Sequence, residues 1–201
     1  MVAVSGPAGG GKSTLVRALA GAMPDTATIG VDSYQRVTER PVREIVQWME
    51  RGADFDEFEI PRLAGDLEKL KRGAAVTDPK TGREIAPRKY ILFETHFGRA
   101  HRDTGRFIDL LIWIDTPLDV ALARNVLDYL APLREAPEAF PLRENLAGIQ
   151  RYLERYVDDV RRLRLLQGET VGAGADLVLD GAARLDSMVE RARREIERRL
   201  P

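Results

Sequence analysis

Apolar and polar residues follow two different periodicities along the chain. Short apolar runs of the kind found in buried strands occupy residues 2–4, 26–31, 90–95, 107–115 and 176–179. Between them, apolar residues recur every three or four positions, as on one face of a helix, over residues 12–23, 41–51, 62–72, 117–130, 144–167 and 182–200. Strands that alternate with helices pair in parallel and are covered on both faces, so the pattern predicts a three-layer α/β fold with a five-stranded parallel sheet.

One insertion interrupts this alternation between the third helical segment and the third strand. Residues 73–78 and 83–86 are short β-rich segments, and the sequence Pro-Lys-Thr-Gly at residues 79–82 between them is a turn signal. We therefore expect an inserted β-hairpin that protrudes from the sheet.

The first apolar run leads directly into a glycine-rich segment that fits the pattern G-x-x-x-x-G-K-[ST]. Glycines let successive backbone N–H groups converge on phosphate oxygens, and the start of the following helix adds its positive end. A glycine-rich turn with an ordinary lysine is the alternative, but the strand before the motif and the amphipathic helix after it favour the P-loop NTPase fold. The residues predicted to bind ATP are Gly6, Ala8, Gly9, Gly10, Gly11, Lys12, Ser13 and Thr14.

Within this motif, three side chains have distinct expected roles. Lys12 bridges the β- and γ-phosphates, Ser13 places its hydroxyl on Mg²⁺, and Thr14 extends toward the α-phosphate. ATP and Mg²⁺ are thus the predicted cofactors. The motif leaves the acceptor of the phosphate open.

Two acidic residues directly follow predicted strands, at the edge of a parallel sheet where ligands bind. Asp32 is either a general base or an indirect Mg²⁺ ligand, and the alternative is an aspartate that forms a turn or caps a helix. Glu94 ends an apolar run, where an acid is hard to place without a partner, so a role in holding the Mg²⁺ shell is favoured over a surface acid.

Three further residues are weaker candidates. His96 lies beside the predicted active edge and is a candidate for contact with the substrate. Glu59 belongs to an acidic and aromatic stretch at residues 54–61 that could select a polyhydroxylated substrate, although a loop position favours simple solvation. Arg124 could contact phosphate, but on sequence alone a solvated helix arginine is the simpler interpretation.

Residues 132–141 contain three prolines and mixed charge, which break the helical periodicity. We predict a short helical lid at about residues 132–143. Closing lids in phosphotransferases exclude water and bring arginines to the transferring phosphoryl group, so Arg134 and Arg143 are the candidate lid arginines.

The composition restricts the class of protein. With 201 residues and 44% apolar content, residues 1–201 are expected to form one domain. A net charge of −1, from 31 basic and 32 acidic residues, predicts neither a nucleic-acid partner nor attraction to an anionic membrane. With no cysteine, no apolar run of membrane-spanning length and no signal sequence, the expected location is cytoplasmic; the oligomeric state stays open, a homo-oligomer included.

The order of these parts resembles the uridine kinase, phosphoribulokinase and pantothenate kinase group of P-loop kinases, and also the nicotinamide riboside kinases. The resemblance spans nearly the whole chain, and only the phosphate loop is specific by itself. It rests on the phosphate loop, Asp32-Ser33-Tyr34, Phe58-Glu59-Ile60-Pro61, Glu94, residues 115–120 with Leu122-Ala123-Arg124, Tyr152, and residues 174–179.

The chain departs from the family pattern at positions that concern the substrate. Ile60 replaces the histidine of the family's Phe-Asp-His-Pro, Thr95 replaces a glycine, and Asn125 replaces a second arginine. The predicted hairpin also lacks the histidine that uridine kinases carry there. These differences leave phosphoryl transfer credible and argue against uridine or cytidine as the acceptor.

The resemblance implies a Mg²⁺-dependent kinase that moves the γ-phosphoryl group of ATP to a hydroxyl of a small metabolite, a nucleoside or a sugar. The implied catalytic residues are Asp32 as base, Lys12, Glu94 and Arg124; those facing the substrate are Asp32, Tyr34, Glu59, His96 and Arg143; those at the metal are Ser13, Asp32 and Glu94. A nucleotide-switched regulatory ATPase without a small-molecule acceptor is the alternative. Phosphorylation of nucleic-acid ends is disfavoured by the near-neutral charge.

Overall fold

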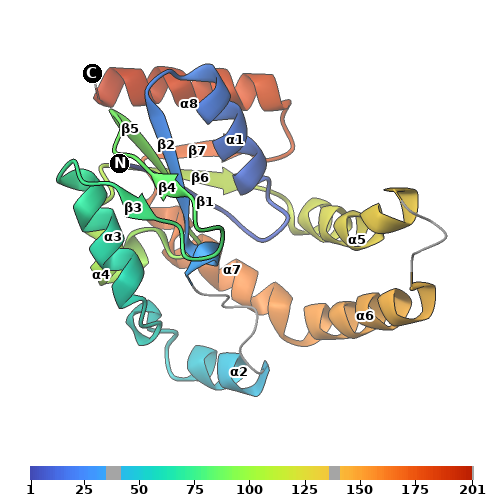
Figure 1. Ribbon diagram of the computed structural model, residues 1–201. Helices are drawn as coiled ribbons and strands as arrows, with labels where there is room; N and C mark the ends of the chain where they lie inside the picture. The colour runs from blue at the N-terminus through green and yellow to red at the C-terminus, as the bar shows by residue number, and fades with distance from the viewer. Residues whose placement is uncertain (35–41, 136–140, 201) are drawn as a thin grey trace.

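The computed structural model describes residues 1–34, 42–135 and 141–200. Its centre is a five-stranded sheet in the order β2-β5-β1-β6-β7, and every neighbouring pair runs parallel (Figure 1). The strands are β1 (Val2–Ser5), β2 (Thr26–Gly30), β5 (Tyr90–Glu94), β6 (Leu110–Asp115) and β7 (Leu177–Asp180). The predicted five-stranded parallel sheet is confirmed.

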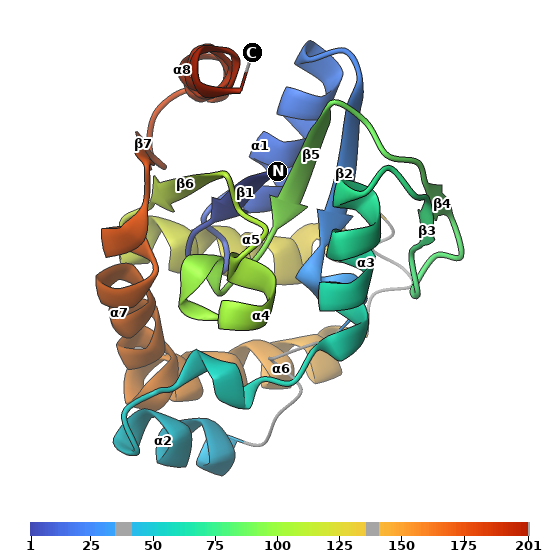
Figure 2. The same ribbon diagram turned by 90° about the vertical axis from the view of Figure 1, so that its left-hand side faces the viewer.

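Helices cover both faces of the sheet (Figure 2). The helices α1 (Lys12–Ala22) and α8 (Leu185–Arg199) pack on one face, where Val2 and Val4 of β1 point. The other face, with Ala3 of β1, is covered by α3 (Pro61–Lys71), α7 (Arg161–Thr170) and the short α4 (Arg102–Gly105). Because successive side chains of a strand point to opposite faces, the continuous apolar runs of the sequence fill two cores, and the three layers are as predicted.

The segment between β2 and α3 forms an aromatic cluster beneath the second face. In α2 (Val42–Glu50), Ile45 and Met49 are buried, and Trp48 is buried beside them. The Trp48 ring packs edge-on against Phe55 and Phe58, with ring centroids 5.2 Å apart in both pairs.

Single turns of 3₁₀-helix occupy η1 (Val31–Ser33), η3 (Phe55–Glu57), η4 (Gly98–Ala100) and η7 (Gly172–Gly174).

The predicted hairpin is present as β3 (Val76–Thr77) and β4 (Glu84–Ile85), which pair antiparallel and project beside β2 (Figure 2). Its turn is closed by Asp78, whose Oδ1 accepts hydrogen bonds from the backbone N–H groups of Lys80 and Thr81 at 2.9 and 2.8 Å. An aspartate that satisfies the turn in this way explains why the segment folds back on itself.

Two long helices, α5 (Leu118–Glu135) and α6 (Leu142–Arg155), extend together from the carboxyl end of the sheet (Figure 1). We call this pair the helical arm. The expectation that the helix ends near residue 130 is wrong, because α5 continues through Pro132 to Glu135. A proline removes one backbone donor but has a helical φ itself, so a further turn can follow it. Residues 136–140, the centre of the predicted lid, lie outside the described residues.

After the arm, the chain stays helical from α6 to α7, as the periodicity of residues 144–167 predicts. The two helices are joined by a turn of π-helix, η6 (Tyr156–Val160), which the sequence pattern did not indicate. Among the helices that the structure describes, none is both long enough and apolar enough to cross a lipid bilayer.

Candidate active site

The phosphate loop runs from the end of β1 into α1, and the segment after β6 holds it from outside. Thr116 donates a hydrogen bond from Oγ1 to the carbonyl of Gly10 at 3.0 Å, and Asn125 donates from Nδ2 to the carbonyl of Ala8 at 3.3 Å. Gly9 has φ +74°, and a Cβ there would lie 2.3 Å from the carbonyl oxygen of Ala121. The glycine is required both by the left-handed backbone and by this close approach.

Lys12 is buried inside the loop. Its Nζ donates hydrogen bonds to the carbonyl oxygens of Gly6 and Pro7, both at 3.1 Å. Burial lowers the pKa of Lys12 to about 8, although the negative charges of Glu94 and Asp32 act in the opposite direction. The nearby carboxylates therefore do not fully offset the cost of burying the Lys12 ammonium, and a bound anion would be stabilised by this charge.

Ser13 and Glu94 meet at the start of α1. The Ser13 hydroxyl donates to Oε1 of Glu94 at 2.6 Å, and Glu94 lies opposite Gly30 in the register of β5 and β2. Two oxygen ligands at this spacing suit a hard cation such as Mg²⁺, which usually takes one or two protein oxygens and completes its shell with water and phosphate oxygens. In the part of the chain that the structure describes, no three His, Cys, Asp or Glu side chains gather into a larger metal site.

Asp32 and His96 form a pair at the same edge. Nε2 of His96 lies 3.1 Å from Oδ1 of Asp32, and Gln167 of α7 donates from Nε2 to the carbonyl of His96 at 2.6 Å. The hydrogen bond from His96 lowers the pKa of Asp32, partial burial opposes this, and the charges of His96, Lys12 and Lys80 lower it further. Asp32 is therefore ionised at neutral pH and able to accept a proton.

Arg164 of α7 is a residue of this site that the sequence analysis missed. Its side chain is only 5% exposed, and its Cζ lies 5.1 Å from the centre of the Tyr156 ring. Nη2 donates to the hydroxyl of Tyr152 at 2.9 Å, whereas Nη1 is buried and has no hydrogen-bond partner among the described residues. The charge of Arg164 also lowers the pKa of Lys12, so two buried cations lie within electrostatic range of each other. Such a pair is costly unless an anion joins it.

The π-helical turn decides where Arg164 points. Tyr152 and Arg164 are twelve residues apart, which in an uninterrupted α-helix would separate them by about 120° around the axis. A π-turn takes up one extra residue, which reduces this separation to about 20° and brings both onto one face. Hydrophobic periodicity does not reveal an inserted residue of this kind, so no sequence signal marked Arg164.

Arg124 lies at the base of the arm rather than beside Asp32. Its Nη2 donates to the carbonyl of Gly181 at 3.1 Å, and its Nη1 would lie 3.9 Å from a Cβ at Gly11. Gly181 is itself confined, since a Cβ there would lie 1.8 Å from Oγ1 of Thr116. Arg124 thus links the loop after β7 to the outer side of the phosphate loop.

The remaining predicted substrate residues are placed elsewhere. The Tyr34 hydroxyl donates to Oδ2 of Asp66 at 2.9 Å, and burial together with this carboxylate raises the pKa of Tyr34. Glu59 and Arg143 are exposed, and no contact among the described residues joins either to the phosphate loop. The side chain of Arg134 lies outside the described part of the chain.

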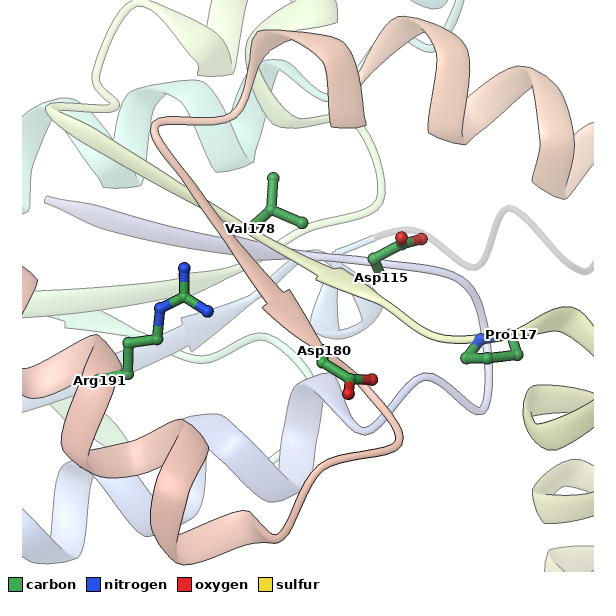
Figure 3. Close-up of a pocket in the computed structure, with 5 residues that line it drawn as sticks. All are labelled: Asp115, Pro117, Val178, Asp180 and Arg191. Carbon is green, nitrogen blue, oxygen red and sulfur yellow. The ribbon is translucent and has the colours of Figure 1, made fainter.

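A hollow of about 400 Å³ opens at the edge of the sheet, next to Gly181 (Figure 3). Its lining consists of Asp115, Pro117, Val178, Asp180 and Arg191. In Figure 3 the two carboxylates stand near the ends of β6 and β7, and Arg191 reaches across from α8. Because none of the residues around Lys12 lines this hollow, it is not the place where the phosphate loop acts.

Two curated proteins resemble the chain in sequence, and no protein-family model matches it. The chain is 28% identical to the cytidylate kinase of Haloarcula marismortui over 156 residues, which cover 78% of this chain and 72% of that protein. It is 28% identical to the cytidylate kinase of Halobacterium salinarum over 184 residues, which cover 90% of this chain and 85% of that protein.

Solved kinase structures share the fold. A protein described as a possible uridine kinase from Bacillus stearothermophilus aligns over 89% of this chain and 87% of its own, with a TM-score of 0.53 and 14% identity. A gluconokinase from Sinorhizobium meliloti aligns over 99% of this chain and 92% of its own, with a TM-score of 0.52 and 18% identity. The fold and the sequence relatives together confirm the predicted resemblance to the P-loop kinases and support the assignment as a P-loop small-molecule kinase.

Proposed function

We propose that the chain transfers the γ-phosphoryl group of ATP to a hydroxyl group of a small metabolite, a nucleoside or a sugar. The observation that carries this proposal is the gathering of charge around Lys12. Glu94, Asp32 and Arg164 come from three separate elements, and all of them act on the pKa of this one lysine. Phosphoryl transfer needs this combination, because cations hold the phosphates while carboxylates serve the metal and the acceptor.

The loop side of the site binds the nucleotide. The backbone N–H groups of the loop and the Lys12 ammonium hold the β- and γ-phosphates. Nη1 of Arg164, which has no hydrogen-bond partner among the described residues, would help to neutralise the γ-phosphoryl group as its charge spreads in the transition state. Ser13 and Glu94 would hold Mg²⁺, which would supply positive charge to offset that of the phosphates.

The acceptor side is defined by Asp32. His96 bonds to Oδ1 and holds the carboxylate in place, and no described residue occupies Oδ2. As the acceptor oxygen bonds to phosphorus and the bond between the γ-phosphorus and the bridging oxygen breaks, the hydroxyl proton passes to Asp32 and ADP leaves. A hydroxyl acceptor needs such a base.

A nucleoside monophosphate is the second candidate acceptor, because the sequence relatives are named cytidylate kinases. A phosphate group is already largely ionised at neutral pH, with a second pKa of about 6, so it can attack without a base. The presence of the Asp32–His96 pair is the reason that we place the hydroxyl acceptor first.

The two candidates respond differently to Asp32→Asn, which keeps the size of the side chain but cannot accept a proton. Release of ADP with ATP and Mg²⁺ is measured over a panel of nucleosides, sugars and cytidylate. With a hydroxyl acceptor, Asp32→Asn should lower kcat by about a hundredfold or more, while the affinity for ATP changes little.

Each of the other possible results favours a different function for the chain. If cytidylate is the substrate and Asp32→Asn leaves its turnover within a few-fold of wild type, the hydroxyl proposal is wrong and the phosphate acceptor takes its place. If no member of the panel accelerates ADP release, the regulatory ATPase is favoured.

A further inference from the structure

Helix α6 and the π-turn η6 that follows it carry an apolar stripe that the described residues of the arm leave exposed. Leu142, Leu146, Leu153 and Val157 are 52%, 51%, 38% and 77% exposed. At about 100° per residue, Leu142, Leu146 and Leu153 lie within a sector of about 40° on the surface of α6, and Val157 follows in the π-turn η6. The buried residues Ile149 of α6 and Tyr156 of η6 lie on the side that packs on the molecule, so the stripe flanks the packed face.

The spacing of the stripe is symmetric. Its members are separated by four, seven and four residues, so the stripe reads the same in both directions along the helix. Two copies of α6 laid antiparallel would therefore place Leu142 against Val157 and Leu146 against Leu153, at both ends of the contact. A two-fold contact between identical chains requires self-complementarity of this kind.

The charges beside the stripe have nearly the same symmetry. Arg143, Gln150 and Glu154 are exposed and lie along one flank, about 80° to 120° from Leu142 on the helix surface. In the antiparallel pair this flank meets its own copy. Arg143 then lies two residues along the axis from Glu154 of the second copy, within reach of its long side chain, and Gln150 lies near the centre. In a parallel two-fold pair this flank would instead face the opposite side of the stripe, so Arg143 and Glu154 would not meet.

We infer that α6 is a homodimer surface on which a second copy of this chain docks antiparallel. The stripe from Leu142 to Val157 is about 24 Å long at about 1.5 Å per residue. A contact between two single helices of this length is at the small end of specific interfaces, so the dimer should be reversible and should depend on concentration.

Sedimentation equilibrium of the full chain tests the inference, with no need for nucleotide or activity. The wild-type mass should rise from that of one chain toward that of two as concentration increases. Leu146→Glu should weaken the dimer by about tenfold or more, because it places a charge at the centre of the stripe. Leu127→Glu is the matched control, since Leu127 is 63% exposed on α5 and is not part of the stripe.

Charge reversal tests the antiparallel register without touching an apolar residue. Arg143→Glu alone and Glu154→Arg alone should each weaken the dimer, and the double variant should restore it. Circular dichroism confirms that each variant keeps its helices. A wild-type chain that stays monomeric at every concentration, equal weakening by Leu127→Glu and Leu146→Glu, or a double reversal that is no better than the singles would each overturn the inference.

Discussion

The two sides of the Lys12 ammonium are built from different kinds of structure. On one side is the phosphate loop, a contiguous segment between β1 and α1 whose carbonyls of Gly6 and Pro7 hold Nζ directly. On the other side is Arg164, which is more than 150 residues away in sequence. A π-helical turn directs its side chain toward the site, and a hydrogen bond to Tyr152 holds it there. Both sides supply positive charge to the same place, but only the first is encoded locally.

This difference has consequences for stability and for function. On the loop side, the Lys12 ammonium and the carbonyl oxygens of Gly6 and Pro7 satisfy each other by hydrogen bonds. On the arm side, Arg164 has a buried nitrogen without a partner among the described residues, which costs free energy in the absence of an anion. We infer that the loop side is a preformed binding site. On the arm side, the buried Arg164 lowers the stability of the protein without nucleotide, and a bound phosphate would remove this destabilisation.

The largest expected effect comes from the loop side. Lys12→Met keeps the length of the side chain but removes its charge, so phosphoryl transfer should fall by about a thousandfold, the loss typical of a group that contacts charge in the transition state. Circular dichroism should show an unchanged fold. Turnover at the wild-type rate would mean that the loop does not bind the transferring phosphates.

The arm side should show a smaller loss of activity with an opposite effect on stability. Arg164→Met should lower phosphoryl transfer by about tenfold to a hundredfold. Without nucleotide, its melting temperature should equal or exceed that of wild type, because Arg164 has no ion-pair partner among the described residues and replacing buried charge with an apolar side chain is often neutral or stabilising. With saturating ATP, the wild type should gain more stability than the variant.

Arg194→Met is the control for that experiment. Arg194 lies on α8, is 74% exposed and pairs with Glu190, so the same chemical change should leave both melting curves nearly unchanged. If Arg164→Met strongly lowers the melting temperature without nucleotide, Arg164 stabilises the fold, and the proposed destabilisation by its buried charge is wrong.

The smallest expected effect is a pH dependence, which should have opposite signs for ATP affinity and for the stability of the protein without nucleotide. Lys12 has a pKa of about 8 in the folded protein, below its ordinary value of about 10.4, so it loses its proton as the pH rises through 8. ATP affinity should fall about fivefold between pH 8 and 9, as expected if only the protonated lysine binds phosphate. Calorimetric titration over this range measures it.

Stability without nucleotide should move in the other direction over the same range. Between pH 8 and about 10.4 the unfolded chain binds more protons at Lys12 than the folded chain, so this residue makes the protein more stable as the pH rises. Lys12→Met should lack both trends. A wild type whose trends match those of the variant would show that Lys12 is not the titrating group.

The parts of the site that could be predicted from sequence are those that depend on neighbouring residues. The phosphate loop is one segment, so its motif specifies it completely. Asp32 and Glu94 became candidates because each lies at or just after the carboxyl end of a strand, and parallel strands end at one edge; Gly30 does lie opposite Glu94 in the sheet. His96 was a candidate for the same reason, and it proved to bond to Asp32.

The parts that could not be predicted depend on packing between distant segments. Arg164 faces the site only because a π-turn shifts the helical register, and an inserted residue leaves no trace in hydrophobic periodicity. The end of α5 was misplaced because Pro132 was taken as a stop, although a helix can continue after it. Tyr34 follows Asp32 closely in sequence, but its hydroxyl bonds to Asp66 of α3, and sequence spacing could not indicate that choice.

The fate of the γ-phosphate of ATP tests the central claim most directly. The protein is incubated with Mg²⁺ and ATP labelled at the γ-phosphorus, with the panel of nucleosides, sugars and cytidylate, and the labelled products are separated. Our account predicts that the label appears on a hydroxyl oxygen of a nucleoside or sugar and not on the phosphate of cytidylate, and that Lys12→Met lowers the transfer by about a thousandfold. Label found only in inorganic phosphate, with every acceptor tested, would contradict it.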